Sequence, residues 1–179
     1  DLAGYYCQHF LLDASKMGVP QRRERVFFIA LRKDLAAPFL KQVDLFCIQP
    51  EFKMEFKEKE IPFSEVFHNY CDRPLIGEVL NVYNEAKKGE TDLRYAAFRL
   101  KGKQDFFGYK LTYPESIPLT VLSSDNVIVF GQSRYRNFDE LLLCGSYPSD
   151  YDFKNNKPEY LIGMSVPPVM VAQIATEIW

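Results

Sequence analysis

Two closely spaced arginines near the start of the chain are the residues best placed to do chemistry. They belong to the first of three blocks, Gly18-Val-Pro-Gln-Arg-Arg-Glu-Arg25. Side chains alternate in an extended segment, so Gln21, Arg23 and Arg25 project on one side and Arg22 on the other. Two guanidinium groups on one face suit a planar acceptor such as a pyrimidine carbonyl, or a phosphate. The alternative is a sheet edge held by surface ion pairs with the intervening glutamate.

The second block combines opposite charges with an aromatic turn. It reads Arg134-Tyr-Arg-Asn-Phe-Asp-Glu140, followed by Gly145-Ser-Tyr-Pro-Ser-Asp-Tyr151. Arg134 and Glu140 can form an internal ion pair that orders the neighbouring region. The alternative is a surface pair, which contributes little to stability.

The third block is Ile162-Gly-Met-Ser-Val-Pro-Pro168, just before an expected helix. Backbone N–H groups at a helix N-terminus favour a carboxylate or hydroxyl ligand. Such a ligand would meet Gly163, Met164 and Ser165. The alternative is a plain helix that begins at proline.

In content and order, the three blocks resemble motifs VIII, IX and X of the DNA (cytosine-5) methyltransferase family. The family patterns are Gln-x-Arg-x-Arg, then Arg-x-x-x-x-x-Glu with an aromatic-Pro turn, then Gly-Asn-Ser-Val-Pro-Pro. Met164 stands where the family usually has Asn, and Leu143 where it often has a further Arg. The resemblance covers the two ends of the chain and says little about residues 51–106, where the family places its sequence-reading region.

The resemblance implies transfer of a methyl group from S-adenosylmethionine to C5 of a flipped cytosine in duplex DNA. Addition of a thiolate at C6 builds electron density on the ring and its O2, which a fixed cation stabilises. By resemblance, Arg25 contacts the flipped cytosine, Arg23 orders the active site and Gln21 positions the adjoining loop. The cofactor pocket is expected to be closed on one side by Gly163, Met164 and Ser165.

Several parts of such an enzyme are missing from this sequence. The family's nucleophile is a cysteine that follows proline, whereas the four cysteines follow Tyr6, Phe46, Tyr70 and Leu143, and no Gly-x-Gly occurs. Asp125-Asn-Val127 comes too late for the family's Glu-Asn-Val segment and indicates a turn at a strand edge. The resemblance therefore implies a missing N-terminal catalytic half upstream of Asp1. We expect the isolated chain to be inactive and to self-associate through apolar surface left uncovered.

Direct reading of DNA is expected from basic residues between 92 and 110. The net charge of −2 counts against a dedicated nucleic-acid binder, but it allows a local basic face. Solvated charges on a strand face are the alternative for each of them. The candidates are Arg94, Arg99, Lys101, Lys103 and Lys110.

The elements that would position these residues indicate an α/β protein. The predicted fold is the C-terminal part of a methyltransferase Rossmann-like domain plus a small mixed α+β target-recognition domain. We expect the end of the catalytic domain at 1–50, target recognition at 51–116, the motif IX region at 117–160 and a returning helix at 161–179.

Apolar patterning predicts the individual elements. Strands are expected at 6–12, 26–31, 117–121 and 127–130, and the continuous apolar run 26–31 is typical of a strand buried on both faces. Short strands and loops are expected over 91–112, and a solvated connection over 51–60. Helices are expected at 61–70, 77–88 and 169–179, and a helix through Leu143 capped by Asn137 or Asp139. The last helix should bury the stripe Val171, Ile174, Ala175 and Ile178.

Composition indicates a folded soluble chain. Of its 179 residues, 47% are hydrophobic and 26% are charged. No uninterrupted apolar run approaches the roughly 18 residues of a membrane span. The cysteines have no zinc-finger spacing, which favours free thiols in a reducing cytoplasm and no metal site. His9 and His68 are isolated, and we expect structural or solvated roles for them.

Two other classes of function fit the same residues. The chain could be a non-enzymatic subunit that binds DNA or complements a separate catalytic chain. It could also belong to an RNA cytosine-5 methyltransferase of the same architecture. A restriction enzyme partner is compatible with the sequence, which shows no sign of one.

Overall fold

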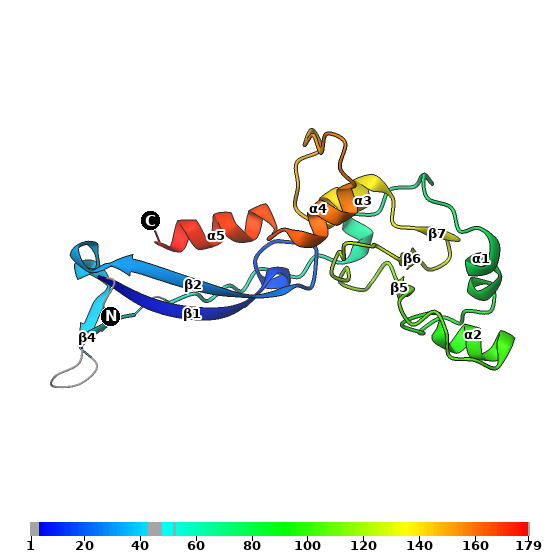
Figure 1. The fold of residues 1–179 in the computed structure, drawn as a ribbon, viewed down its shortest axis with the longest axis horizontal. Coiled ribbons are helices and arrows are strands. Elements are labelled where there is room, and N and C mark those ends of the chain that lie inside the picture. The colour runs from blue at the N-terminus through cyan, green and yellow to red at the C-terminus, as the bar shows by residue number, and fades with distance from the viewer. Residues whose placement is uncertain (1–3, 43–47, 52, 179) are drawn as a thin grey trace.

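The computed structural model describes residues 4–42, 48–51 and 53–178, which form an elongated molecule (Figure 1). A long hairpin and the C-terminal helix lie at one end, and a small sheet with two helices lies at the other. The mixture of helices and strands agrees with the predicted α/β class. Cys47 and Trp179, which the sequence predictions include, lie outside the described residues.

The elements follow in this order. The strands are β1 (Tyr5–Asp13), β2 (Glu24–Arg32), β3 (Leu40–Gln42), β4 (Ile48–Pro50), β5 (Lys110–Thr112), β6 (Val127–Val129) and β7 (Arg134–Tyr135). The α-helices are α1 (Gly77–Tyr83), α2 (Arg94–Lys101), α3 (Phe138–Cys144), α4 (Pro158–Met164) and α5 (Pro168–Ile178). Single 3-10 turns occur at Ala14–Lys16, Lys33–Leu35, Ala37–Phe39 and Phe63–Glu65.

The hairpin of β1 and β2 confirms the first two predicted strands. The strands pair antiparallel, with His9 opposite Phe28. Alternation places Leu12 and Ile29 in a core with α5, on the inner face. On the outer face, Val26 is 53% exposed and Phe28 is 79% exposed. The prediction of a strand buried on both faces is therefore wrong for the described part of the chain, because α5 covers only one face.

The loop between β1 and β2 is fixed from within. Asp13 caps the 3-10 turn at Ala14–Lys16 by accepting a hydrogen bond from a backbone N–H. Met17 and Val19 are fully buried, and Gly18 between them takes the left-handed conformation with φ 73°. The loop therefore holds the first block in a defined conformation up to the start of β2.

The connection 51–60 is mostly exposed, as expected, but it is not wholly solvated. Met54 is 8% exposed and belongs to the hairpin core, against which Phe56 also packs. β3 and β4, which precede this connection, form a short antiparallel pair.

The region from 61 to 112 differs most from the predictions. The helix expected over 61–70 is reduced to the 3-10 turn at Phe63–Glu65, and α1 ends at Tyr83 instead of continuing to 88. The prediction of only strands and loops over 91–112 is wrong, because α2 lies there. Leu93, Ala96 and Ala97 are fully buried at helical spacing.

A three-stranded sheet shares one core with α1 and α2. β5 pairs parallel with β6, and β6 pairs antiparallel with β7. β6 confirms the strand expected at 127–130, but the strand expected at 117–121 is not formed. Backbone oxygens of this segment bind other groups instead: Pro118 accepts from the Arg22 N–H and Leu119 from the Arg136 side chain.

The C-terminal helices are only partly as predicted. α5 confirms the helix expected at 169–179, but α4 has no counterpart among the predictions. Met170 and Ile174 are the buried residues of α5, whereas Val171 is 47% exposed. The predicted stripe is therefore wrong for Val171 and Ala175, because the helix turns the residues one position before them toward the hairpin.

The stretch Pro158–Ile178 is long and apolar enough to cross a membrane, by length and composition alone. Here the chain leaves the helical path at Ser165, which has extended backbone angles, and two prolines follow. The stretch is thus divided into α4 and α5, and α5 shares the hairpin core.

Candidate functional site

The first block forms an extended segment that leads into β2, and its side chains alternate in burial. Gln21 is 1% exposed and Arg23 is 2% exposed, while Arg22 and Glu24 are exposed. Arg25, the first basic residue within β2, is half-buried. The structure therefore places Gln21, Arg23 and Arg25 on one side, as the sequence predicts.

Arg23 joins its own segment to two distant ones through their backbone oxygens. Its Nη1 donates to the carbonyl of Val121 at 3.1 Å. Its Nη2 donates to the carbonyls of Gly163 and Ser165, each at 2.8 Å. The first and third blocks, 140 residues apart in sequence, are thus held by one guanidinium group.

The meeting point of Arg23, Val121 and the turn at 163–165 is called the Arg23 junction. Gln21 also contributes to it. Its amide nitrogen donates to the carbonyl of Cys144 at 2.6 Å, and its amide oxygen accepts from the N–H of Val121 at 3.0 Å. The same oxygen lies 3.4 Å from Nη1 of Arg23. Gln21 therefore connects the end of α3, the 117–121 segment and the Arg23 side chain.

The charge of Arg23 is not neutralised by any carboxylate among the described residues. Burial, and next the positive charge of Arg25, lower the pKa of its guanidinium from the ordinary value. A guanidinium still stays protonated at neutral pH. Its Nε is buried without a hydrogen-bond partner in the described chain. This junction is therefore a fixed positive centre that is stabilised by carbonyl dipoles.

Arg25 stands beside this centre and is less constrained. Its Nη1 donates to the backbone carbonyl of Glu24 at 2.7 Å. No ion pair between Arg25 and a carboxylate forms among the described residues, so the alternative of surface pairing with Glu24 is not observed. The side chain remains able to contact an external acceptor.

The third block ends a helix before it starts the next one. The N–H of Ser165 donates to the carbonyls of Leu161 and Ile162, at 3.1 and 3.3 Å, and thereby ends α4. Its hydroxyl donates to the carbonyl of Ile162 at 2.9 Å. The expected free N–H is thus already used at Ser165, whereas its hydroxyl oxygen can still accept. Met164 is 67% exposed.

Gly163 is required at its position by close packing. A Cβ atom there would come within 2.5 Å of the carbonyl carbon of Leu122 and the nitrogen of Ser123. Backbone atoms cannot move aside cheaply at such distances. Gly163 therefore sets how closely α4 approaches the segment that carries Val121.

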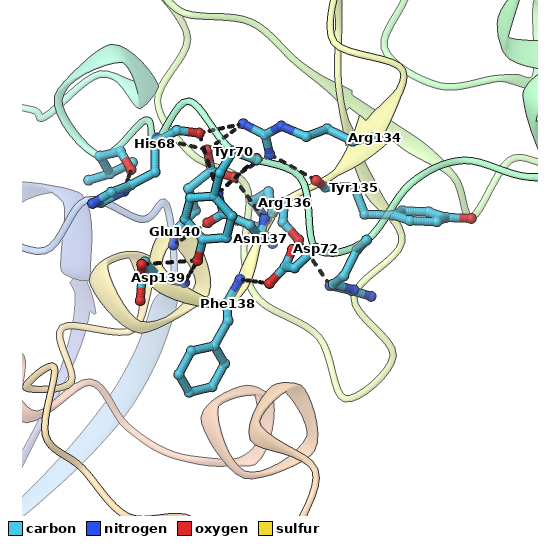
Figure 2. Close-up of polar contacts among 12 residues, drawn as sticks. His68, Tyr70, Asp72, Arg134, Tyr135, Arg136, Asn137, Phe138, Asp139 and Glu140 are labelled. Carbon is cyan, nitrogen blue, oxygen red and sulfur yellow. Dashed lines mark hydrogen bonds and ion pairs between the residues drawn. The ribbon is translucent and has the colours of Figure 1, made fainter.

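The expected ion pair of the second block is buried and bidentate (Figure 2). Arg134 Nη1 lies 2.8 Å from one oxygen of Glu140, and Nη2 lies 2.7 Å from the other. Asn137 caps α3 and completes a capping box with Glu140. Arg134 and Asn137 also donate to the carbonyl of His68, at 3.0 and 3.3 Å. The pair therefore fixes the segment 68–72 against α3 and is not the weak surface pair of the alternative.

A second buried ion pair was not foreseen from the sequence. Arg136 donates from Nε and Nη2 to the two carboxylate oxygens of Asp125, and both side chains are fully buried. Arg136 also donates to the Leu119 carbonyl at 3.0 Å, and Arg73 donates to the Asp125 carbonyl at 2.9 Å. The pair holds the 117–125 segment next to the Arg23 junction. In the sequence, only the abundance of polar residues around Asp125 could have indicated it.

The five predicted DNA-reading residues are spread over α2 and its flanks, and four of them form ion pairs. Arg99 binds Glu90 and Lys101 binds Glu78. Arg94 and Lys110 share one carboxylate, that of Asp92, at 3.3 and 3.1 Å. Lys103 is exposed, and the described residues offer it no ion-pair partner.

Among the described residues, no histidine or cysteine side chain forms a hydrogen bond with Gln21 or Arg23, although the Cys144 carbonyl accepts from Gln21. The ring of His68 lies 3.1 Å from the carbonyl of Val66, and His9 lies on the exposed face of the hairpin near Phe28. Cys7 and Cys71 are exposed free thiols and Cys144 is a buried one. The described residues contain no group of three metal-ligating side chains.

Comparison with known proteins identifies the family. No curated protein sequence matches the chain significantly. The profile of the family "C-5 cytosine-specific DNA methylase" matches residues 1–179. A mutant of DNMT2 from Spodoptera frugiperda superposes with a TM-score of 0.64 at 14% identity, over 98% of this chain and 58% of that one. A putative DNA modification methyltransferase encoded within an E. coli prophage superposes with a TM-score of 0.63 at 16% identity, over 99% of this chain and 61% of that one. The Entamoeba histolytica methyltransferase EhMeth superposes with a TM-score of 0.60 at 15% identity, over 99% of this chain and 54% of that one.

At these identities the solved structures show the fold alone, a Rossmann-like methyltransferase fold, which confirms the predicted fold class. The chain spans somewhat more than half the length of each of them. The family match, in contrast, covers every residue of the chain. This protein belongs to the C-5 cytosine-specific DNA methylase family.

Proposed function

We propose that this chain supplies DNA recognition and part of the base and cofactor pockets of a DNA cytosine-5 methyltransferase. Such an enzyme transfers a methyl group from S-adenosylmethionine to C5 of a flipped cytosine in duplex DNA. The observation that carries the proposal is the junction at Arg23. This buried cation holds the first and third blocks together and stands next to Arg25, which no described carboxylate neutralises.

Arg25 would contact the flipped cytosine. When a nucleophile adds at C6, electron density grows on the ring and on O2, and a fixed positive charge near O2 stabilises it. Arg23 contributes to the same field without touching the base, since its Nη1 and Nη2 bind carbonyls and its Nε is buried. Its role is to keep the start of β2 aligned with the turn at 163–165. Gln21 holds the loop that faces this turn.

The turn at 163–165 has groups that fit one side of S-adenosylmethionine. Met164 and Val166 expose apolar side chains that could cover an adenine ring, and the Ser165 hydroxyl can accept a hydrogen bond. Gly163 keeps the turn close to the 122–123 backbone and would contribute no side-chain contact. The cofactor supplies the methyl group when bound.

The nucleophile would come from polypeptide outside this sequence, because none of the four cysteines follows proline. We infer that this N-terminal catalytic half covers the exposed apolar face of the hairpin, where Val26 and Phe28 lie. Without it, the same face would drive self-association of the chain.

We assign residues 51–116 to target recognition, 1–50 and 161–179 to the catalytic domain, and 117–160 to the region that joins them. The hairpin and α5 share one core, which supports joining 1–50 with 161–179. A second core joins α1, α2 and β5 of 51–116 to β6 and β7 of 117–160. DNA contacts would fall to the basic residues of 92–110. Four of these would exchange an acidic partner for a phosphate or base edge, whereas Lys103 would not need to do so.

The test is methyl transfer by the gene product that contains this chain, from labelled S-adenosylmethionine to duplex DNA and to structured RNA. Arg25→Ala should reduce transfer to DNA by about 100- to 1,000-fold, because it removes a charge used in the transition state. Arg32→Ala is the matched control, since Arg32 ends the same strand and pairs with exposed Asp34. Full activity of Arg25→Ala would overturn its assigned role.

Two further outcomes would redirect the proposal. Transfer to RNA alone would make the protein an RNA cytosine-5 methyltransferase. Transfer only after mixing with a second protein that carries a Pro-Cys nucleophile would make the chain a complementing subunit.

A further inference from the structure

A cavity of about 540 Å³ opens between the first block and the recognition region. It is lined by Arg22 of the first block, by Lys110 of β5 and by residues of the segment 113–119. The backbone of this segment is fixed to the first block, because Pro118 accepts from the Arg22 N–H at 3.0 Å. In Figure 1, the yellow-green chain after β5 runs back toward the blue loop before β2. The volume falls within the roughly 300–1,000 Å³ typical of small-molecule sites.

The charges around the cavity leave an excess of positive charge. Arg22 is exposed, and no carboxylate in the described chain forms an ion pair with it. Lys110 shares the carboxylate of Asp92 with Arg94, so two cations meet one anion. Glu115 is the acidic residue of the lining. Such a rim attracts an anionic group, which Arg22 and Lys110 can bind together.

The rest of the lining is mainly apolar. Tyr113, Ile117 and Leu119 contribute to it. The Tyr113 ring is fixed, since its hydroxyl donates to the Glu90 carbonyl at 2.7 Å and accepts from the Gly89 N–H at 3.0 Å. A fixed aromatic ring with aliphatic neighbours is a surface on which a planar base can stack.

We infer that this cavity binds one unstacked nucleotide of the substrate, other than the target cytosine. Its phosphate lies between Arg22 and Lys110, and its base lies against Tyr113, Ile117 and Leu119. The exposed Glu115 carboxylate accepts from an exocyclic amino group of that base, so adenine, cytosine or guanine is bound in preference to thymine. The inference rests on the proposed function. The site is separate from the Arg25 site because Arg22 and Arg25 project on opposite sides of the segment.

The first experiment measures binding of the complete gene product to fluorescent duplex oligonucleotides at several salt concentrations. Arg22→Ala should weaken binding by about 3- to 10-fold and reduce the slope of log K against log salt by about one. Arg22→Lys should keep that slope. Ile117→Trp, which fills the cavity, should weaken binding without changing the slope. Matched controls are Lys59→Ala for a lost exposed charge and Leu35→Trp for an added ring; both residues are exposed and outside the lining.

The second experiment locates the nucleotide. 2-Aminopurine is placed in turn at each position around the target, because its fluorescence rises when the base leaves the stack. One position other than the target should brighten with the wild-type protein and stay dark with Ile117→Trp. Thymine at that position should weaken binding, and Glu115→Gln should reduce this preference. If no such position brightens, or if Arg22→Ala and Ile117→Trp bind as tightly as wild type, the cavity is not a nucleotide site.

Failure of the cavity inference and failure of the proposed function give different results in these experiments. A protein that methylates DNA but shows no second bright position refutes the cavity site alone. A protein that binds and methylates neither DNA nor RNA refutes the proposed function itself.

Discussion

The three buried arginines Arg23, Arg134 and Arg136 are stabilised by two different kinds of partner. Arg134 and Arg136 each bind a buried carboxylate through two contacts. Arg23 binds backbone carbonyls and an amide oxygen, and it keeps its full positive charge unpaired by any described anion. The paired arginines suit a structural role, while the unpaired one suits a site that must attract electron density.

The Arg134–Glu140 pair should be a sensitive point for stability. Glu140→Ala leaves the Arg134 charge buried and alone, which costs about 3–5 kcal/mol of unfolding free energy. It also removes half of the capping box. Asp150→Ala, at an exposed acid in the turn after α3, should change the value by less than about 0.5 kcal/mol. Denaturant unfolding of both variants checks this, and equal midpoints would contradict the structural role of the pair.

The three cysteines of the described chain should differ sharply in reactivity. Burial raises the pKa of the Cys144 thiol to about 11, from an ordinary value of 9.0. At pH 8, Cys144 should therefore resist a thiol reagent until the protein unfolds, while exposed Cys7 and Cys71 react at once. Because the folded-state pKa is raised, this thiol stabilises the fold fully below pH 9 and loses that contribution between pH 9 and 11. Mass mapping of the labelled cysteines decides, and early labelling of Cys144 would refute the prediction.

Elements with a simple pattern could be predicted from the sequence. The hairpin strands follow aromatic and apolar runs, and α3 follows from a capping residue with a glutamate three positions later. α2 was missed because its outer face carries Tyr95 and Phe98, which hide the buried spacing of Leu93, Ala96 and Ala97. A helix whose exposed side is also apolar has no clear periodic signal.

The candidate site shows the same division. The alternation of Gln21, Arg23 and Arg25 could be predicted because it depends only on extended geometry. The partners of Arg23 could not, since backbone carbonyls are present at every residue and leave no mark in the sequence. The Asp125–Arg136 pair depends on a turn that brings two segments together, and no local pattern encodes it.

The orientation of α5 gives a direct test at the level of an element. Ile174→Ala should cost about 2–5 kcal/mol, because this side chain is buried in the hairpin core. Val171→Ala should cost less than about 1 kcal/mol, because Val171 is about half exposed. The stripe predicted from the sequence would give similar losses for both. Thermal or denaturant unfolding of the two variants distinguishes these cases.

On the scale of the molecule, the described residues form three apolar clusters: at the hairpin with α5, around α3 and α4, and among α1, α2 and the small sheet. These groups of elements follow one another along the molecule (Figure 1). The first cluster covers one face of the hairpin and leaves the other face apolar and open. Leu11, Val26 and Phe28 are 65%, 53% and 79% exposed on that face. A surface of this kind is typical of an interface.

Residues 1–179 alone should therefore self-associate. Phe28→Lys should shift the chain toward monomer in sedimentation experiments, because it places a charge in the centre of the open face. Tyr160→Lys is the control, since Tyr160 is 50% exposed on α4 and is not part of the hairpin core. A chain that is monomeric at high concentration before any substitution would rule out the open face as an interface.

The anchors of Arg23 have a consequence for how such proteins diversify. Val121, Gly163 and Ser165 are held through main-chain oxygens, which every amino acid provides. The Arg23 anchors themselves therefore place no requirement on the length or composition of residues 51–116, provided that the backbone returns along the same path. A chimera that exchanges residues 51–116 for the corresponding stretch of a relative should keep its junction intact. Under the proposed assignment of target recognition to 51–116, specificity would pass with this segment while the Arg23 contacts stay the same.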